Sequence, residues 1–204
     1  MNNVYYNREM LKIIESSVGQ KKKLLLHSCC APCSTACLER LVGAFDITIF
    51  YYNPNIDSQD EFNLRASEQV RYAKSLGIDC IVAGFDKQSF LSEVKGLEQE
   101  KEGGARCDKC FKLRLGKTAE KCLEGGFDYF ATTLTVSPLK NAKLINEIGF
   151  SLQKSLGAKY LPSDFKKQNG YLRSITLSKE NNLYRQNYCG CEFSKIKQQE
   201  EGRL

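Results

Sequence analysis

Seven of the ten cysteines in this chain stand in three short clusters, and cysteine is a residue type that binds metal and carries redox chemistry. Thiolates bind soft or borderline metals, and four of them suit Zn²⁺ or an iron–sulfur cluster equally well. Three clusters in one chain therefore predict a metal or redox centre without naming the metal. The clusters are Cys29-Cys30-x-x-Cys33, Cys107-x-x-Cys110 and Cys189-Gly190-Cys191.

The first cluster favours iron–sulfur over zinc. Zinc ribbons usually pair one C-x-x-C with another, whereas Cys29 and Cys30 are adjacent and follow the apolar stretch "LLLHS" (24–28). Adjacent thiolates can ligate different irons of a polynuclear cluster, because its corners are spread apart. Cys33 is undecided, since a position at a helix start lowers the pKa of a thiol and aims it at the site, while packing is an equal alternative.

The motif Cys189-Gly190-Cys191 has its own chemistry. One intervening residue makes a small, strained disulfide ring, and strained disulfides are more easily reduced. Glycine relieves part of that strain because it admits unusual backbone angles. We interpret the pair as a two-electron store or as two further metal ligands, with two unlinked surface thiols as the alternative.

The other cysteines and the single histidine carry less information. Cys37, Cys80 and Cys122 fall inside predicted helices or strands, and we expect them to act as small apolar side chains. His27 lies on a predicted strand, and we interpret it as a hydrogen-bonded core histidine rather than as a ligand or an acid.

Strands alternate with helices of ten or more residues, which predicts a parallel sheet covered by helices on both faces. Sites in such sheets form outside the carboxyl ends of the strands. The residues that fall there are Cys29, Cys30, Asn53, Asp86 and Thr133. We expect strands at 22–28, 45–56 and 78–85 and a strand with its loop at 127–138, helices at 4–17, 32–42, 60–77, 107–126 and 141–156, and a polar surface excursion at 87–106.

The predicted fold is an α/β, three-layer, Rossmann-like arrangement that resembles the adenine-nucleotide alpha-hydrolase-like (PP-loop) fold without its nucleotide loop. The segment "SCCAPCS" (28–34) occupies the place of the glycine-rich serine loop of ATP pyrophosphatases but has none of its glycines, which disfavours ATP binding. No linker divides the chain, so we expect one domain over 1–204. It would carry a helical extension at 1–20 and a C-terminal segment at 160–195 that returns the C-G-C motif to the site.

The composition of the chain indicates the cellular compartment and the kinds of partner to expect. No apolar run approaches the roughly 20 residues needed to span a bilayer, and no signal-peptide pattern opens the chain. We therefore expect a cytoplasmic protein with no membrane partner, whose cysteines stay reduced unless they bind metal or do redox work. The net charge of +6 allows an anionic partner such as RNA without requiring one.

Long segments of the chain resemble the non-cobalamin epoxyqueuosine reductases. They cover most of residues 24–194 and include "LLLHSCCAPCS", "FYYNPNI" with "EFNLR", "GLEQEKEGGARCDKCFKLRL", "TTLTVSPLKN" and "DFKKQNGYLRSITLSKENNLYRQNYCGCEFS". The resemblance implies an oxidoreductase that catalyses the last step of queuosine synthesis. Epoxyqueuosine at the wobble position of tRNA would lose its epoxide oxygen in a two-electron reduction and become queuosine.

The resemblance also implies cofactors and roles for the cysteines. A [4Fe–4S] cluster would be held by the adjacent cysteine pair and the C-x-x-C, and the C-G-C thiols would be redox-active. The residues are Cys29, Cys30, Cys107 and Cys110 for the cluster and Cys189 and Cys191 for the redox pair. A second, mononuclear iron is a further expectation, with Cys33 or the C-G-C thiolates as ligands and Lewis-acid chemistry at the epoxide oxygen. The electron donor is not identified.

A tRNA substrate gives basic and aromatic side chains an expected role in phosphate contacts and in stacking on an unpaired base. A solvated or salt-bridged side chain is the alternative for each of them. The expected substrate-binding residues are Asn53, Lys140, Asn141, Lys166, Lys167, Tyr171, Arg173 and Arg185, with Tyr184 as a second candidate for stacking.

Two other functions stay open at this point. One is a zinc-stabilised RNA-binding module without redox chemistry, which would be colourless where an iron–sulfur protein is brown. The other is a thiol–disulfide oxidoreductase that uses Cys189 and Cys191 on protein substrates, in which mutation of Cys107 would leave activity intact.

Overall fold

The computed structural model describes the backbone of residues 5–17, 19–200 and 202, which contains a four-stranded parallel sheet in the order β3-β2-β1-β4. The strands are β1 (Lys22–His27), β2 (Phe45–Tyr51), β3 (Asp79–Val82) and β4 (Tyr129–Thr132). The helices are α1 (Tyr6–Ser17), α2 (Ala31–Leu41), α3 (Gln59–Ser75), α4 (Lys87–Glu93), α5 (Ala105–Glu124), α6 (Ala142–Leu156), α7 (Gly170–Glu180) and α8 (Glu192–Glu200), with the 3-10 turn η1 at Thr133–Val136.

The central strand β1 is buried on both faces, which explains its continuous apolar run. Leu24 and Leu26 pack on one face with α2 residues such as Leu38, whereas Leu25 packs on the other face with Ala119 of α5. Strands of parallel sheets are covered in this way and therefore read as apolar runs rather than as alternating patterns.

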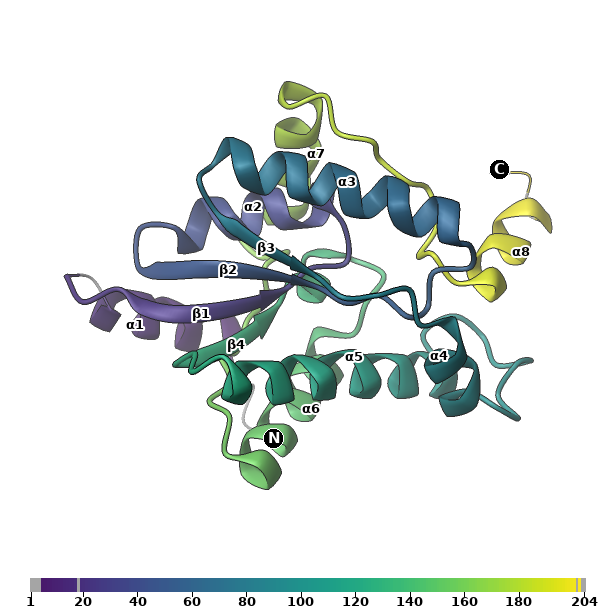
Figure 1. Cartoon of the computed structure of the whole chain (residues 1–204), viewed down its shortest axis with the longest axis horizontal. Coiled ribbons are helices and arrows are strands. Elements are labelled where there is room, and N and C mark those ends of the chain that lie inside the picture. Colours follow the sequence, from purple (N-terminus) through teal and green to yellow (C-terminus); the bar gives the residue numbers. More distant parts are fainter. Residues whose placement is uncertain (1–4, 18, 201, 203–204) are drawn as a thin grey trace.

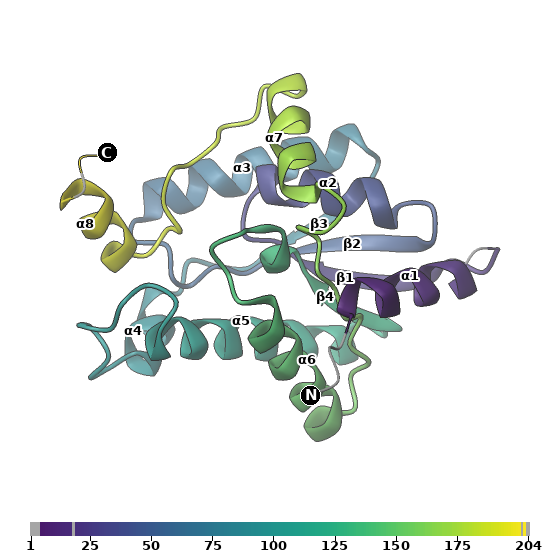
Figure 2. The ribbon, with the colours of Figure 1, turned by 180° about the vertical axis from the view of Figure 1, so that it is seen from behind.

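Helices cover both faces of the sheet (Figure 1 and Figure 2). α2 and α3 lie on one face, with α7 packed on α2, and α5 and α6 lie on the other. The predicted three-layer α/β class is confirmed, because all the strand pairs are parallel.

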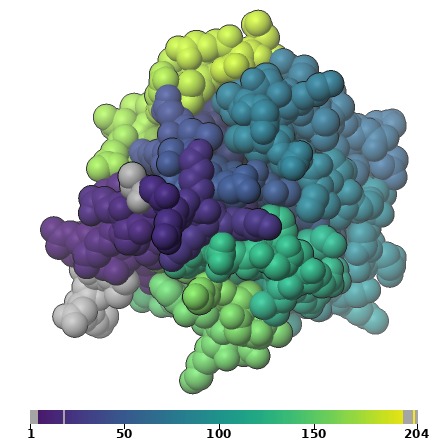
Figure 3. All heavy atoms as spheres, turned by 60° about the vertical axis from the view of Figure 1, so that its left-hand side comes forward, coloured from purple at the N-terminus to yellow at the C-terminus, as the bar shows by residue number. Residues whose placement is uncertain are grey.

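The helix α1 packs over the amino-terminal part of β1. Met10 is fully buried in the same apolar cluster as Leu24. Figure 3 shows this end of the molecule, with α1 (purple) in front. The strands begin at this end of the molecule and point away from it (Figure 1). The loops that follow their carboxyl ends therefore lie at the opposite end of the sheet.

The sequence does not predict α4, α7 or α8. The segment 87–106, expected as a surface excursion, begins with α4, whose cap Asp86 accepts a hydrogen bond from the Ser89 N–H at 3.3 Å. α7 is poor in strong helix formers and is stabilised by packing on α2. It begins at Gly170, where a Cβ atom would overlap the carbonyl oxygen of Phe165. In the described part of the chain, no helix combines the length and apolarity needed to cross a bilayer.

Candidate metal centre and pocket

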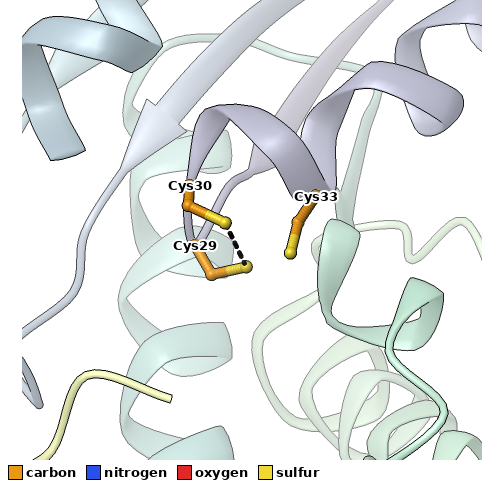
Figure 4. A group of neighbouring side chains, drawn as sticks. All are labelled: Cys29, Cys30 and Cys33. Carbon is orange, nitrogen blue, oxygen red and sulfur yellow. Dashed lines mark hydrogen bonds between the residues drawn. The ribbon is translucent and has the colours of Figure 1, made fainter. Parts of the chain in front are cut away.

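Three cysteine thiols converge where β1 leads into α2. The Sγ atoms of Cys29, Cys30 and Cys33 all lie within 4.8 Å of one another, and those of Cys29 and Cys30 are 3.8 Å apart. Figure 4 shows Cys29 and Cys30 before the helix and Cys33 in its first turn, with the sulfurs directed at one another. This set of soft donors fits a thiophilic metal or an iron–sulfur cluster.

Polar contacts from neighbouring elements hold the loop that carries these thiols. The Ser28 hydroxyl donates to Oε1 of Gln69 on α3 at 2.7 Å, and Nδ2 of Asn53 donates to the Ser28 carbonyl oxygen at 3.0 Å. The Cys29 N–H donates to the Thr133 hydroxyl at 3.4 Å. The carboxyl ends of three adjacent strands therefore fix the loop, as expected for a site in a parallel sheet.

The charges at the cluster are uneven. Hydrogen bonds from the thiols of Cys30 and Cys33, assisted by the positive charges of Lys140 and Arg114, hold the pKa of Cys29 well below its usual value. The hydrogen bond to Cys29 and burial raise the pKa of Cys30 to about 12. Hydrogen bonds to Cys29 and Cys30, together with burial, also raise the pKa of Cys33. A metal that binds all three sulfurs must therefore displace the protons that these thiols carry.

The C-x-x-C motif lies at the start of α5, outside this group of three. The Sγ of Cys107 accepts a hydrogen bond from the Gly103 N–H at 3.2 Å, and the side chain packs against the same apolar cluster as Cys29. Cys110 is buried in another apolar cluster together with Cys191. Burial raises the pKa of Cys110 to about 11. The structure thus brings Cys29 and Cys30 together with Cys33, and it places the other two predicted ligands on a neighbouring helix.

The C-G-C motif precedes α8 and is fixed to the loop before α3. The Asp57 N–H donates to the Gly190 carbonyl oxygen at 2.9 Å, and the Tyr188 hydroxyl donates to Oδ1 of Asp57 at 3.0 Å. Gly190 has a φ of +114°, a backbone conformation that residues with a Cβ rarely adopt. The two cysteines flank this turn as free thiols.

A pocket of about 440 Å³ opens beside these groups. Its lining combines cysteines from two clusters with basic, aromatic and polar residues of the C-terminal segment. The residues include Cys29, Cys33, Cys189, Lys140, Tyr171, Arg185, Arg114, Glu102, Gln186, Tyr188 and Ser194. Thiols, cations and aromatic rings therefore face one space, which is large enough for part of a nucleotide.

A family model described as epoxyqueuosine reductase QueH matches residues 24–197, a range that includes every cysteine named above. The chain belongs to the epoxyqueuosine reductase QueH family. The member from Staphylococcus epidermidis is 44% identical over 205 residues, covering 96% of this chain and 86% of that protein. The member from Thermotoga maritima is 33% identical over 181 residues, covering 87% of this chain and 93% of that protein.

Two solved structures resemble the fold at low sequence identity. The U34-tRNA thiolase NcsA from Methanococcus maripaludis, solved with its [4Fe–4S] cluster, has a TM-score of 0.53 at 15% identity, covering 96% of this chain and 74% of that chain. A predicted subunit of a tRNA methyltransferase from Methanocaldococcus jannaschii has a TM-score of 0.55 at 14% identity, covering 89% and 88%. At these low identities, the two structures support only the fold of this QueH family member.

The residues predicted to bind substrate divide into two groups. Lys140, Tyr171 and Arg185 line the pocket. The others lie outside the lining. Lys166 pairs with Asp164, and Arg173 pairs with Glu39. Asn141 caps α6 by accepting a hydrogen bond from the Leu144 N–H, while Lys167 and Tyr184 are exposed.

The role of Asn53 in substrate binding stays a prediction, and the structure places this residue inside the protein. The residue is 1% exposed, and both ends of its amide are engaged inside the protein. Nδ2 donates to the Ser28 carbonyl oxygen, and Oδ1 accepts from Nη2 of Arg114 at 2.5 Å. In this arrangement Asn53 ties the cysteine loop to Arg114.

The core histidine prediction is confirmed. His27 is fully buried, and its Nδ1 lies 2.8 Å from the Thr132 hydroxyl. Burial, assisted by the charge of Arg114, lowers the pKa of His27 to about 3, so the ring is neutral at physiological pH. Cys37 and Cys122 are fully buried as expected, and Cys80 is partly buried.

The sequence reasoning missed several residues of the pocket lining, above all Arg114. Its only signal was a basic residue on the apolar side of "CFKLRLG" (110–116). Glu102, Gln186, Tyr188 and Ser194 gave no signal, because their place in the lining depends on how the C-terminal segment folds back.

Proposed function

We propose that this protein reduces epoxyqueuosine at the wobble position of tRNA to queuosine. The observation that carries the proposal is membership of the QueH family over residues 24–197, and the thiols beside the pocket supply chemistry that suits the reaction. Both C–O bonds of the epoxide break, a C=C bond forms between the two ring carbons, and the oxygen leaves as water. The reaction consumes two electrons and two protons.

Lys140 is the proposed partner of the epoxide oxygen. It lines the pocket together with Cys29 and Cys33. Burial works to lower the pKa of Lys140, but attraction to the thiolate forms of the nearby Cys189, Cys29 and Cys33 outweighs burial and raises it. The ammonium group therefore stays charged at neutral pH. Nζ can donate a hydrogen bond to the oxygen as negative charge develops there.

Cys29, Cys30, Cys107 and Cys110 are the proposed ligands of a [4Fe–4S] cluster. Their support is the chemistry of the donor set. Cys29, Cys107 and Cys110 pack against apolar clusters, Cys30 is buried beside Cys29, and Cys29 lines the pocket. When bound, such a cluster supplies electrons one at a time. Cys33, which contacts the first pair, is the proposed ligand of a second, mononuclear iron.

The Cys189 and Cys191 thiols are the proposed second electron reservoir. Oxidation of two thiols to a disulfide releases two electrons and two protons, which matches the demand of the reaction. Cys189 lines the pocket with Cys29. An external reductant would return the disulfide to thiols after each turnover.

The pocket rim is the proposed contact for the anticodon loop. The Arg185 guanidinium lies over the Tyr171 ring, 5.6 Å from its centroid, and Leu139 on the rim is 77% exposed. Flat and apolar surfaces of this kind suit unpaired bases next to a nucleotide that enters a pocket. With tRNA as the substrate, the proposed compartment is the cytoplasm.

Anaerobic turnover tests the proposal. Iron-reconstituted protein, dithionite and tRNA that carries epoxyqueuosine would be incubated, and the nucleosides analysed by mass spectrometry. We expect conversion to queuosine, abolished in Cys29→Ala and Cys107→Ala and retained in Cys80→Ser, a partly buried cysteine outside the lining. No conversion by protein with its full iron complement would reject the reductase. Bound zinc without iron would favour the RNA-binding alternative.

A further inference from the structure

Arg114 is a buried cation beside the cysteines. It lies on α5, one helical turn after Cys110, and is 1% exposed. Its guanidinium donates from Nε to Nε2 of His27 at 3.3 Å, and from Nη2 to Oδ1 of Asn53 at 2.5 Å. Nη1 points at the Cys110 sulfur at 4.0 Å.

The neighbours of this arginine do not neutralise it. An arginine is always protonated, so it must donate to His27, which is a neutral ring here, and Asn53 is an uncharged amide. Among the side chains that the structure describes, no carboxylate lies within 4.0 Å of its nitrogens. Arg65, another buried arginine near the cysteines, differs because it pairs with Glu61 at 2.6 Å.

Sulfur is the group in contact with this guanidinium that can carry negative charge, since Glu102, which lines the same pocket, forms no ion pair with it within 4.0 Å. The Cys110 sulfur contacts the guanidinium, and Cys29 lines the same pocket as Arg114. Lys140, a second cation in that lining, likewise has no carboxylate within 4.0 Å among the described side chains. Arg114 is buried and Lys140 is partly buried, and a buried charge is retained when it is paired, here with the thiols that both cations face.

We propose that Arg114 is the positioning residue and fixed counter-charge of an anionic thiolate–iron centre, and this rests on the cluster of the proposed function. Four thiolates on a [4Fe–4S]²⁺ core carry a net charge of −2, which Arg114 and Lys140 balance. The guanidinium also ties α5, the helix of Cys107 and Cys110, to the strand ends at His27 and Asn53. It thereby holds the two cysteine pairs at a fixed distance.

The counter-charge has a measurable consequence. Net charge and hydrogen bonds to the sulfurs set the reduction potential of an iron–sulfur cluster. Reduction adds one negative charge, and a positive charge beside the sulfurs favours it. Removal of that charge from Arg114 makes the cluster harder to reduce, so the midpoint potential becomes more negative.

The test is an anaerobic redox titration of iron-reconstituted protein, followed by visible absorbance and electron paramagnetic resonance. Arg114→Gln removes the charge, and Arg114→Lys keeps it without the planar fork. Lys112→Gln is the control, because it removes a positive charge from an exposed position of the same helix. For Arg114→Gln we expect the reduced-to-oxidised ratio at a fixed potential to fall at least tenfold, which is 59 mV for one electron. Arg114→Lys should shift the ratio less.

The outcomes separate this inference from the proposed function. A potential for Arg114→Gln equal to that of Lys112→Gln overturns the counter-charge. Wild-type protein that binds no iron overturns the cluster itself. If circular dichroism shows that Arg114→Gln is unfolded, Asn53→Asp carries the same expectation, because its carboxylate neutralises the guanidinium without removing it. An unchanged potential in folded Asn53→Asp then rejects the proposal.

Discussion

Arg65 of α3 donates a hydrogen bond to the carbonyl oxygen of Cys189, with 3.4 Å between Nη1 and that oxygen. The same guanidinium lies over the Tyr188 ring, 4.9 Å from its centroid, and pairs with Glu61 at 2.6 Å. The C-G-C motif is therefore held by an element 124 residues earlier in the chain. Because Arg65 is anchored by its own carboxylate, it fixes the backbone of the motif while leaving both thiols free to react.

Gly190→Ala should release this motif from the pocket. The native φ of +114° strains a residue with a Cβ by roughly 1–3 kcal/mol, and the added Cβ would lie 3.0 Å from Nη1 of Arg65. We expect turnover to fall about tenfold or more, with iron content unchanged, as measured by nucleoside analysis and iron determination. Gly84→Ala is the control, since its Cβ would meet no atom within 4 Å. Equal turnover in the two variants would contradict the positioning of the thiols by this turn.

Cysteine substitutions should identify the ligands of the cluster. With Cys29, Cys30, Cys107 and Cys110 as ligands, Cys107→Ser loses iron and acid-labile sulfide, whereas Cys33→Ser keeps the [4Fe–4S] cluster and loses at most the mononuclear iron. Iron and sulfide per protein and visible absorbance measure this. The control is Cys80→Ser, a partly buried thiol outside the pocket lining.

The reverse result would have a clear meaning. Loss of the cluster in Cys33→Ser with retention in Cys107→Ser would replace the predicted set by the three thiols that the structure brings together.

The sequence predicts the strand-end position of Cys29 and Cys30 because local signals agree there. A buried strand, a run of three leucines and a proline in the following helical turn allow one arrangement, and the structure has it. The same reasoning finds Lys140, which directly follows a strand and its loop. Local periodicity and strand-end position are sufficient for such residues.

Arg114 escapes this reasoning because its environment is made by distant residues. Its hydrogen-bond partners lie 87 and 61 residues earlier in the chain, at His27 and Asn53. In a helix, the pattern around it is equally typical of an arginine whose stem packs on the core while its head reaches solvent. The contact of the Asn53 amide oxygen with Arg114 escapes the reasoning in the same way, since this cation is distant in the sequence.

Lys140→Met should slow the chemical step while leaving the iron centre in place. The substitution removes the proposed hydrogen bond to the epoxide oxygen, and loss of such a donor typically lowers kcat by about 100-fold or more. Single-turnover kinetics with pre-reduced protein measure the step directly. Lys143→Met is the control, because Lys143 is exposed on α6 and pairs with Glu147 at 3.7 Å. A loss confined to tRNA affinity would make Lys140 a phosphate contact instead.

Tyr171→Ala should weaken tRNA binding if its ring supports an unpaired base. Stacking contributes about 1–3 kcal/mol per base, so Kd for the anticodon stem-loop should rise about 5- to 100-fold in fluorescence anisotropy. Tyr171→Phe keeps the ring and loses only the hydroxyl that accepts from Nη2 of Arg185 at 3.4 Å, so it should bind nearly as the native protein does. Leu172→Ala, an exposed neighbour on α7 outside the lining, is the control for general damage to the helix. Equal weakening by Tyr171→Phe would assign the effect to the placement of Arg185 over the pocket rather than to base stacking.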